Sequence, residues 1–372
     1  MKRSRLLPAV CVLCLLLTLL CACAAEEEVP EAARPQSVTL WFVRGEFFSK
    51  ELVTLAEQYN QEGHRATLEL RGFNSESELG EAMNSARPDL LLCGHERAFS
   101  LYEQGRLKAL PFSDDAAPVY TGNFTAASDC VGISFFPLGA EIPMLIANVE
   151  ADGSAFSYLD SLCAAASDYA LREGKAYFTA DSFTLLFTSC LTQLDSPFYG
   201  DSARDRENDD YCSLYNLLAN AAFDRGVVGS EPPVLPQVEQ GDIVCAFVSS
   251  STLGGYEGNT LAFYPVPLMK GGQPLCLTRA YGLAVTAPFD ENLENVAEFI
   301  LWLNEPERIT PIALRQGLMP AVEGKTDSDA LSSAFSAALN GRQLCFPSAD
   351  SNYFLDDREF EAEFRAALAL LG

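Results

Sequence analysis

Residues 37–71 read SVTLWFVRGEFFSKELVTLAEQYNQEGHRATLELR, and the succession of patterns in this stretch indicates the fold class. Its first seven residues are a near-continuous run of β-prone apolar residues, which predicts a strand. Apolar side chains then recur with the spacing of one helical face, at Leu52, Leu55, Ala56 and Tyr59. Residues 65–71 set Leu68 and Leu70 against charged neighbours and predict a second strand. A strand, a helix and a strand in succession are typical of a parallel sheet covered by helices.

The same alternation continues further along the chain. We expect a helix over residues 75–85, a strand over 89–93 and a helix over 96–104. Past residue 139 the pattern is more helical, and a later strand over 275–286 precedes a helix that ends before Pro306. The fold class is therefore α/β, in which small molecules bind beyond the carboxyl ends of the strands.

The length of the chain indicates its number of domains, and its charge excludes one class of partner. The chain has 372 residues, which favours two domains at about 150 residues each. Its 51 acidic residues against 25 Lys plus Arg give a net charge of −26, with no local basic patch. We therefore expect no nucleic-acid partner.

One long apolar stretch lies at the start of the chain. Lys2, Arg3 and Arg5 precede an apolar run over residues 6–25, which predicts an export signal. A single membrane-spanning anchor is the competing interpretation, because the run is about long enough to cross a bilayer. Both interpretations place the rest of the chain outside the cytoplasm.

The segment Leu20-Cys21-Ala22-Cys23 resembles the lipobox of bacterial lipoproteins, where the last Cys receives the lipid. Cys21 departs from the small residue that is commoner at the second lipobox position. The resemblance implies a signal peptide over residues 1–22 and lipidation of Cys23, which would anchor the protein to the bacterial cell membrane. Residues 23–36 are rich in Glu, Ala and Pro and predict a flexible tether.

The remaining cysteines predict buried thiols. Beyond the signal and Cys23, eight occur, at positions 93, 130, 163, 190, 212, 245, 276 and 345. Several lie inside apolar runs, where a Cys behaves as a small buried hydrophobe. Disulfides are the alternative, since an extracytoplasmic location permits them.

No catalytic or metal-binding motif marks the chain. His64 and His95 are its only histidines, and neither has ligand spacing to a Cys or another His, so we expect no metal site. The acidic run over residues 201–210 lacks the spacing of a calcium loop. The serines in VSSSTLGG, residues 248–255, do not form a G-x-S-x-G motif, and no phosphate-binding glycine loop is present. We expect neither an enzyme nor a cofactor.

Several segments together resemble the extracellular solute-binding proteins of bacterial ABC importers, family 1, which includes the maltose- and oligosaccharide-binding lipoproteins. The first strand ends near Trp41 and leads into LVTLAEQYNQEG. The other matching segments are RPDLLLCGHERAFSLYEQGRLKAL, FFPLGAEIPMLIANVEA, QGDIVCAFVSSSTLGG, FYPVPLMKGG, RAYGLAVTAPFDENLENVAEFILWLNEPE and QGLMPAVEG. Their order and spacing carry the resemblance.

The resemblance implies a two-lobe fold of the periplasmic-binding-protein type II class. Each lobe would have a central, mostly parallel sheet flanked by helices, and crossing segments would form a hinge. The amino-terminal lobe would hold residues 37–138 and 274–319. The carboxy-terminal lobe would hold residues 139–273 and 320–372.

The resemblance also implies ligand-binding residues between the lobes. Each has a structural alternative: core packing for Trp41, a hinge contact for Glu141, and an ordinary surface position for the charged residues. The expected ligand-binding residues are Trp41, Arg44, Glu46, His95, Glu96, Glu141, Ser249, Ser250, Ser251, Tyr256, Arg279 and Tyr281.

The implied function is capture of a small-molecule solute and its delivery to the permease subunits of an ABC importer. A carbohydrate is favoured, although the presence of only two Trp residues weakens an oligosaccharide as the ligand. We expect a monomer. A ligand-sensing or structural lipoprotein on the same scaffold, without a transport role, is the alternative.

Overall fold

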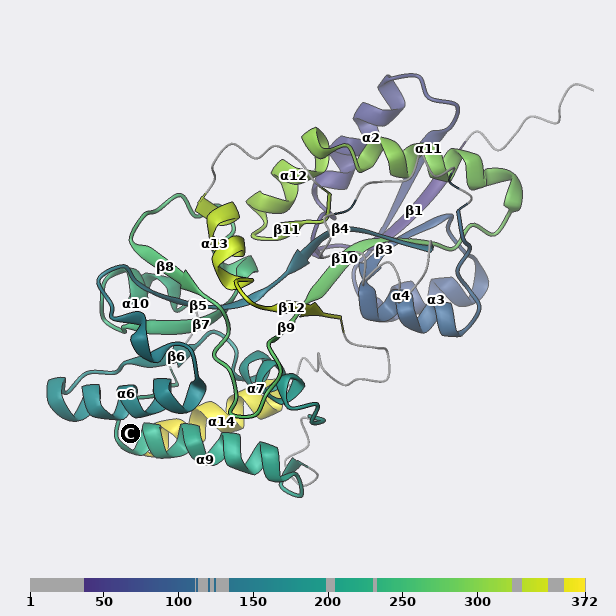
Figure 1. Ribbon diagram of the computed structural model, residues 1–372. Coiled ribbons are helices and arrows are strands. Elements are labelled where there is room, and N and C mark those ends of the chain that lie inside the picture. The colour runs from purple at the N-terminus through teal and green to yellow at the C-terminus, as the bar shows by residue number, and fades with distance from the viewer. Residues whose placement is uncertain are drawn as a thin grey trace, which may run out of the picture.

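The computed structural model describes residues 37–110, 112, 120, 124, 134–198, 205–229, 233–322, 330–346 and 358–371. They form two lobes, each with a central sheet and helices around it (Figure 1). The predicted signal peptide, the tether, Cys23 and Cys130 lie outside the described residues. Within the described ranges, no helix combines the length and the apolar character needed to cross a membrane.

The amino-terminal lobe is built on a six-stranded sheet of order β11-β4-β10-β3-β1-β2. Its strands are β1 (Ser37–Val43), β2 (Thr67–Phe73), β3 (Leu90–Gly94), β4 (Phe135–Glu141), β10 (Arg279–Val285) and β11 (Met319–Pro320). As predicted, β1 pairs in parallel with both β2 and β3. The helices of this lobe are α2 (Glu51–Gln61), α3 (Glu76–Ser85), α4 (His95–Glu103), α11 (Leu293–Leu303) and α12 (Pro306–Arg315), with a short η4 (Asp290–Asn292).

Successive residues of β1 point to opposite faces of this sheet. Leu40 belongs to the core under α2 and α11, with Tyr59 and Phe299. Trp41 belongs to the core on the other face, with Leu79 of α3. Figure 1 shows α2, α11 and α12 on one side of the sheet and α3 and α4 on the other.

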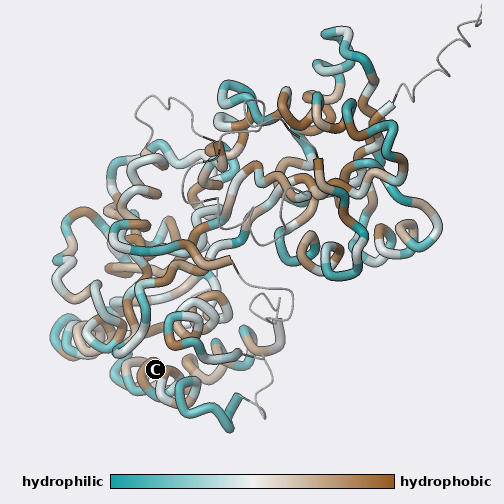
Figure 2. The backbone as a smooth tube through the Cα atoms, turned by 45° about the vertical axis from the view of Figure 1, so that its right-hand side comes forward, coloured by the Kyte–Doolittle hydropathy of each residue, from teal (hydrophilic) through white to brown (hydrophobic). Residues whose placement is uncertain are grey.

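The carboxy-terminal lobe has a four-stranded sheet of order β6-β7-β5-β8. Its strands are β5 (Pro143–Asn148), β6 (Phe178–Ala180), β7 (Cys245–Ser249) and β8 (Leu261–Tyr264). Its helices are η2 (Gly153–Ala155), α6 (Leu159–Glu173), α7 (Phe183–Gln193), α9 (Asp209–Phe223), α10 (Leu235–Glu239), α13 (Ala330–Ala338) and α14 (Arg358–Leu371). In Figure 2, hydrophobic residues run through the central segments of both lobes, while hydrophilic residues lie mostly on the outer turns.

An aromatic cluster fills the carboxy-terminal core. The ring of Phe187 on α7 lies 5.1 Å from that of Phe360 and 5.0 Å from that of Phe364, both on α14. It also lies 5.4 Å from the ring of Tyr211 on α9. The last described helix is therefore part of this core and not an appendage.

The two-lobe α/β fold is as predicted, whereas the sheets are mixed rather than mostly parallel. Strand β10 runs antiparallel to β3 and β4, and β11 runs antiparallel to β4. In the second sheet only β6 and β7 pair in parallel. Strands that return from the other lobe need no crossover helix, so nothing forces them into the parallel direction.

The chain passes between the sheets at Ile142, since β4 ends at Glu141 and β5 begins at Pro143. The predicted lobe limits after residues 138 and 319 fall inside β4 and β11, so we place the first crossing at Ile142. Just before β10, β9 (Leu275–Leu277) pairs with β12 (Gln343–Cys345) in a separate two-stranded sheet.

The lobes meet closely at the turn η3 (Ser250–Leu253), which follows β7. Gly317, just after α12, has φ of +70°, and a Cβ there would lie 2.2 Å from the Ser250 carbonyl oxygen. Only glycine fits both the left-handed backbone and this approach.

Seven of the eight cysteines after Cys23 are described, and within the described residues none of them forms a disulfide. The thiols of Cys93, Cys163, Cys190, Cys245 and Cys276 are buried, as predicted, while Cys212 and Cys345 are partly exposed. Burial raises the pKa of Cys163 and of Cys276 to about 12, so both thiols are poor nucleophiles in the folded protein.

Candidate functional site

Strand register brings several polar residues to the junction of the lobes. Arg279, at the start of β10, pairs with Glu141, at the end of β4. Ser249, at the end of β7, pairs with Pro143, two residues beyond Glu141. Because β4 and β5 are consecutive, the ends of both sheets meet around Glu141.

Glu141 links the two lobes through its carboxylate. The hydroxyls of Ser249 and Ser251 each donate a hydrogen bond of 2.5 Å to its Oε1. The Tyr281 hydroxyl donates to Oε2 at 3.5 Å, from the amino-terminal sheet. One carboxylate thus holds a turn of one lobe and a strand of the other.

Arg279 extends this group within the amino-terminal lobe. Its Nε donates to Glu96 Oε1 at 3.0 Å, and its guanidinium lies 5.3 Å from the centre of the Tyr281 ring. The Arg279 side chain is 40 % exposed and that of Glu96 22 %, so solvent still reaches the pair. Gly94 makes room for it, since a Cβ there would lie 2.6 Å from a Glu96 carboxylate oxygen.

The charges in this group shift the pKa values of their neighbours. Burial lowers the pKa of the Arg279 guanidinium, but the acidic groups around it, led by Tyr281 and Glu96, outweigh that effect and the pKa is raised. Burial, and then the charge of Glu141, holds the pKa of Tyr281 well above its usual range, so its hydroxyl remains a donor.

Glu46 interacts with the charges of the same group. Burial raises its pKa, against the opposing charges of Arg97 and Arg279. The neighbouring Phe47 places its ring 4.7 Å from that of Tyr281, edge to face. We name the group the interlobe cluster: Glu46, Glu96, Glu141, Ser249, Ser251, Arg279 and Tyr281.

Two other predicted site residues, Trp41 and Arg44, make their contacts outside this cluster. Trp41 is 6 % exposed and packs against Phe73 at 5.2 Å, with the Arg71 guanidinium 4.8 Å from its ring. Arg44 is exposed and donates to the Asn74 side chain.

His95, Ser250 and Tyr256 are buried. The His95 ring lies among phenylalanines, 5.8 Å from the ring of Phe135. The Ser250 hydroxyl accepts from the Ile142 amide and so supports the crossing. The Tyr256 hydroxyl lies 3.3 Å from Thr260 Oγ1, within its own loop.

Sequence reasoning missed Phe47 and Arg97. Phe47 adjoins the predicted Glu46, and the only signal was its place in the turn after β1. Arg97 forms an ion pair with Glu76, and burial lowers its pKa against the raising effect of Glu46. Its position two residues beyond His95 was the available signal.

The interlobe cluster is suited to binding rather than to bond cleavage. The two serine hydroxyls donate to a carboxylate, and the carboxylates, the guanidinium and the phenol offer donors and acceptors in several directions. Such an arrangement matches hydroxyl or amino groups on a small solute. Two pockets of the described structure lie elsewhere, one of about 380 Å³ between α9 and α14 and one of about 640 Å³ beside α6.

Neither a protein-family model nor a curated protein sequence matches this chain. Solved structures do. The sugar-binding protein MalE from Xanthomonas citri has a TM-score of 0.67 at 10 % identity, over 90 % of this chain and 92 % of that one. The cyclic α-maltosyl-1,6-maltose binding protein from Arthrobacter globiformis has a TM-score of 0.62 at 16 % identity, over 91 % and 95 % of the two chains.

A third solved structure widens the range of named ligands. The spermidine/putrescine ABC transporter substrate-binding protein from Streptococcus pneumoniae has a TM-score of 0.58 at 11 % identity, over 90 % of this chain and 99 % of that one. These likenesses show that the chain has the type II fold of periplasmic binding proteins.

Proposed function

We propose that this chain is an extracytoplasmic solute-binding protein that captures a small solute between its lobes and delivers it to an ABC-type importer. The observation that carries the proposal is the Glu141 carboxylate, which accepts from Ser249 and Ser251 of one lobe and from Tyr281 of the other. A solute at this position touches both lobes at once. It therefore stabilises the closed arrangement, which the permease recognises.

The chemistry of the interlobe cluster favours a carbohydrate. Sugar hydroxyls both donate and accept, and carboxylates beside a guanidinium and serine hydroxyls satisfy both roles. The edge-to-face rings of Phe47 and Tyr281 supply an apolar surface beside these groups. Two structural neighbours are named as sugar-binding proteins, which agrees with this choice, and the spermidine/putrescine-binding neighbour supplies the competing class.

We also propose the lipid anchor, the protein partners and the monomeric state that the sequence predicts. Lipidation of Cys23 holds the protein at the bacterial cell membrane, and the permease subunits of the importer are its protein partners. The protein acts as a monomer and carries out no chemistry on its solute.

The test is thermal unfolding against a panel of monosaccharides, oligosaccharides, amino acids, polyamines and small anions. A solute at 100 times its Kd adds about 2.7 kcal/mol to the free energy of unfolding, which raises the Tm visibly. A shift with a sugar supports the carbohydrate proposal, and a shift with a polyamine replaces it by the competing class. No shift across the panel contradicts the transport proposal and favours the sensor or structural lipoprotein.

Two serine variants connect binding to the cluster. Ser251→Ala removes a donor to Glu141 and should weaken solute affinity about fivefold, the equivalent of one hydrogen bond. Ser154→Ala is the matched control, because the Ser154 hydroxyl also donates to a carboxylate, that of Asp152, but far from the cluster. Equal affinities for the two variants would place the solute elsewhere.

A further inference from the structure

The turn η3 presents Ser251 to the interlobe cluster, so its position matters for the site. Its base is fixed to the crossing point, where the Ser250 amide donates to the Ile142 carbonyl oxygen at 2.8 Å. The Ile142 amide in turn donates to the Ser250 hydroxyl at 3.0 Å. These bonds hold the start of the turn at Ser250. They do not reach Thr252, further along the turn.

Asp181 supplies that support. The Thr252 hydroxyl, next to Ser251 in the turn, donates to Asp181 Oδ2 at 2.8 Å. The other carboxylate oxygen accepts from the Val234 amide at 3.0 Å, and the Asp181 amide donates to the Phe247 carbonyl oxygen on β7 at 2.9 Å. One residue therefore ties the turn to β7 and to the start of α10.

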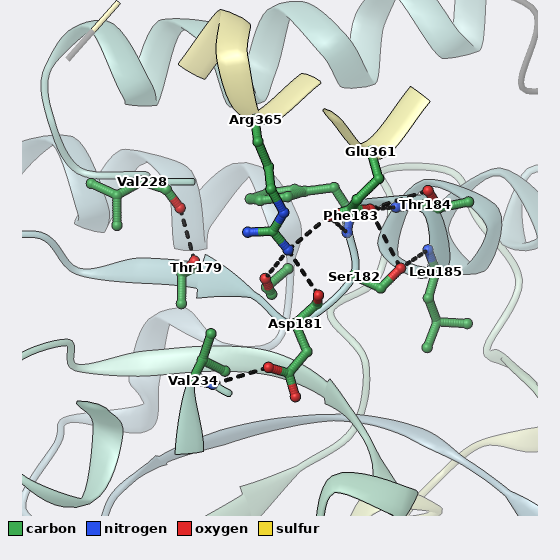
Figure 3. A network of polar contacts seen from close by, with 11 residues as sticks. Thr179, Asp181, Ser182, Phe183, Thr184, Leu185, Val228, Val234, Glu361 and Arg365 are labelled. Atoms are coloured by element: carbon green, nitrogen blue, oxygen red, sulfur yellow. Dashed lines mark hydrogen bonds and ion pairs between the residues drawn. The ribbon is translucent and has the colours of Figure 1, made fainter. Parts of the chain in front are cut away.

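Helix α14 fastens the backbone of Asp181 (Figure 3). The Arg365 guanidinium donates to the carbonyl oxygens of Ala180 and Asp181, at 3.0 and 2.8 Å. It also pairs with Glu361 at 2.7 Å and lies 5.2 Å from the centre of the Phe183 ring. The Arg365 side chain is only 10 % exposed, so these contacts are shielded from water.

Glu361 fixes the next residues of the same segment. Its carboxylate accepts from the amides of Phe183 and Thr184 at 3.1 and 2.9 Å, and from the Thr184 hydroxyl at 3.1 Å. These amides begin α7, where the partial positive charge of the helix favours an anion. A helix distant in sequence thus clamps residues 180–184 through two of its charged side chains, Glu361 and Arg365.

We propose that Asp181 is a positioning residue for the solute site, held in place by Glu361 and Arg365 of α14. This inference rests on the proposed function, because it concerns the same interlobe cluster. Asp181 fixes Thr252, and Thr252 fixes the turn that carries Ser251. Loss of this support leaves the lobes folded but loosens the hydroxyl donors of the cluster.

Hydrogen exchange in the purified protein tests the proposal without any solute. Thr252→Val should speed exchange of the amides of residues 250–253 about fivefold, since it removes one hydrogen bond. Thr252→Ser should restore the slow exchange because it returns the hydroxyl. Thr179→Val is the matched control, as it deletes a bond of the same length from Thr179 to the Val228 carbonyl oxygen in the segment after α9.

A second variant tests the clamp. Arg365→Met should also speed exchange in residues 250–253, acting through Asp181. Arg342→Met removes another arginine bond to a backbone carbonyl, that of Val266, and should leave the turn unchanged. Unchanged exchange in Thr252→Val, or equal exchange in Thr179→Val, overturns the proposal.

Titration with maltose and with spermidine separates this inference from the proposed function. Where a probe binds, Thr252→Val should raise its Kd about fivefold, and Thr252→Ser should return it toward the original value. An unchanged Kd overturns the positioning role in binding. If neither probe binds the unmodified protein, that result counts against the proposed solute classes, and the exchange data still decide the role of Asp181.

Discussion

The two lobes contribute to the interlobe cluster in different ways. The amino-terminal lobe supplies charged side chains, Glu46, Glu96 and Arg279, from separate strand ends and loops. The carboxy-terminal lobe supplies two neutral hydroxyls, Ser249 and Ser251, from one turn. Long charged side chains reach the site from several directions, whereas a short hydroxyl is useful only where its backbone is held.

The hydrophobic cores of the two lobes are also built differently. The amino-terminal lobe begins with a local run of strands and helices, and its sheet is packed on both faces. The carboxy-terminal core depends on rings brought together from distant segments, among them Phe187 and Phe364. The lobe whose site hydroxyls need a held backbone also builds its core from the rings of separate helices, α7, α9 and α14.

The largest expected effect is in the aromatic core. Phe187→Ala should lower the free energy of unfolding by about 4 kcal/mol, because a fully buried ring is replaced by a cavity. Urea unfolding followed by circular dichroism measures the change. Phe223→Ala, at a ring that is 72 % exposed in the same lobe, should cost less than about 0.5 kcal/mol. Equal costs would contradict the assigned core.

Trp41→Ala makes the matching test in the amino-terminal lobe. We expect a loss of about 3 kcal/mol in stability, since Trp41 packs on Phe73. Solute affinity, measured by calorimetry well below the Tm, should stay the same. A large loss of affinity at unchanged stability would show that Trp41 contacts the solute.

The region of sequence around β1 shows how far prediction can go. The spacing of Leu52, Leu55, Ala56 and Tyr59 predicted a helix, and these four side chains are the buried face of α2. That pattern is local, so periodicity reveals it. The antiparallel entry of β10 between β3 and β4 is not local, and no spacing along the chain specifies it.

The site was predictable only in part. A strand end directed attention to Glu96 and the expected crossovers to Glu141 and Arg279, and the structure brings these residues into one group. Position in a strand does not tell which face a side chain occupies in a given environment, so Trp41 was included although it lies in the core. The support from Asp181 could not be found, because it depends on a contact with Thr252 across 71 residues.

The contact between the lobes gives an effect of intermediate size. Gly317→Ala should cost about 3 kcal/mol, because it combines a strained left-handed backbone with a clash against the Ser250 carbonyl. Gly341→Ala is the control, since its φ is +69° but a Cβ there meets nothing within 4 Å. It should cost only about 1 kcal/mol. Thermal unfolding of both variants checks the difference.

The smallest effect concerns the pH response of the cluster. Burial raises the pKa of Glu46 from 4.5, so the folded protein holds this proton to higher pH than the unfolded chain does. The ionised carboxylate therefore opposes folding at neutral pH, and this penalty disappears below the unfolded pKa.

Glu46→Gln should accordingly raise the Tm at pH 7, by no more than the equivalent of about 1 kcal/mol. The gain should vanish as the pH falls below 4.5. Glu57→Gln, at an exposed position on α2, provides the baseline at each pH. A gain that is constant with pH would show that ionisation of Glu46 is not its cause.

The buried thiols can report on the opening of each lobe separately. Cys93 lies in the amino-terminal sheet, while Cys163, Cys190 and Cys245 lie in the carboxy-terminal core. A thiol reagent can modify these residues only when their own lobe opens, and peptide mass spectrometry distinguishes them. The order in which they are modified under mild denaturant would reveal which lobe fails first, with no engineered label in the chain.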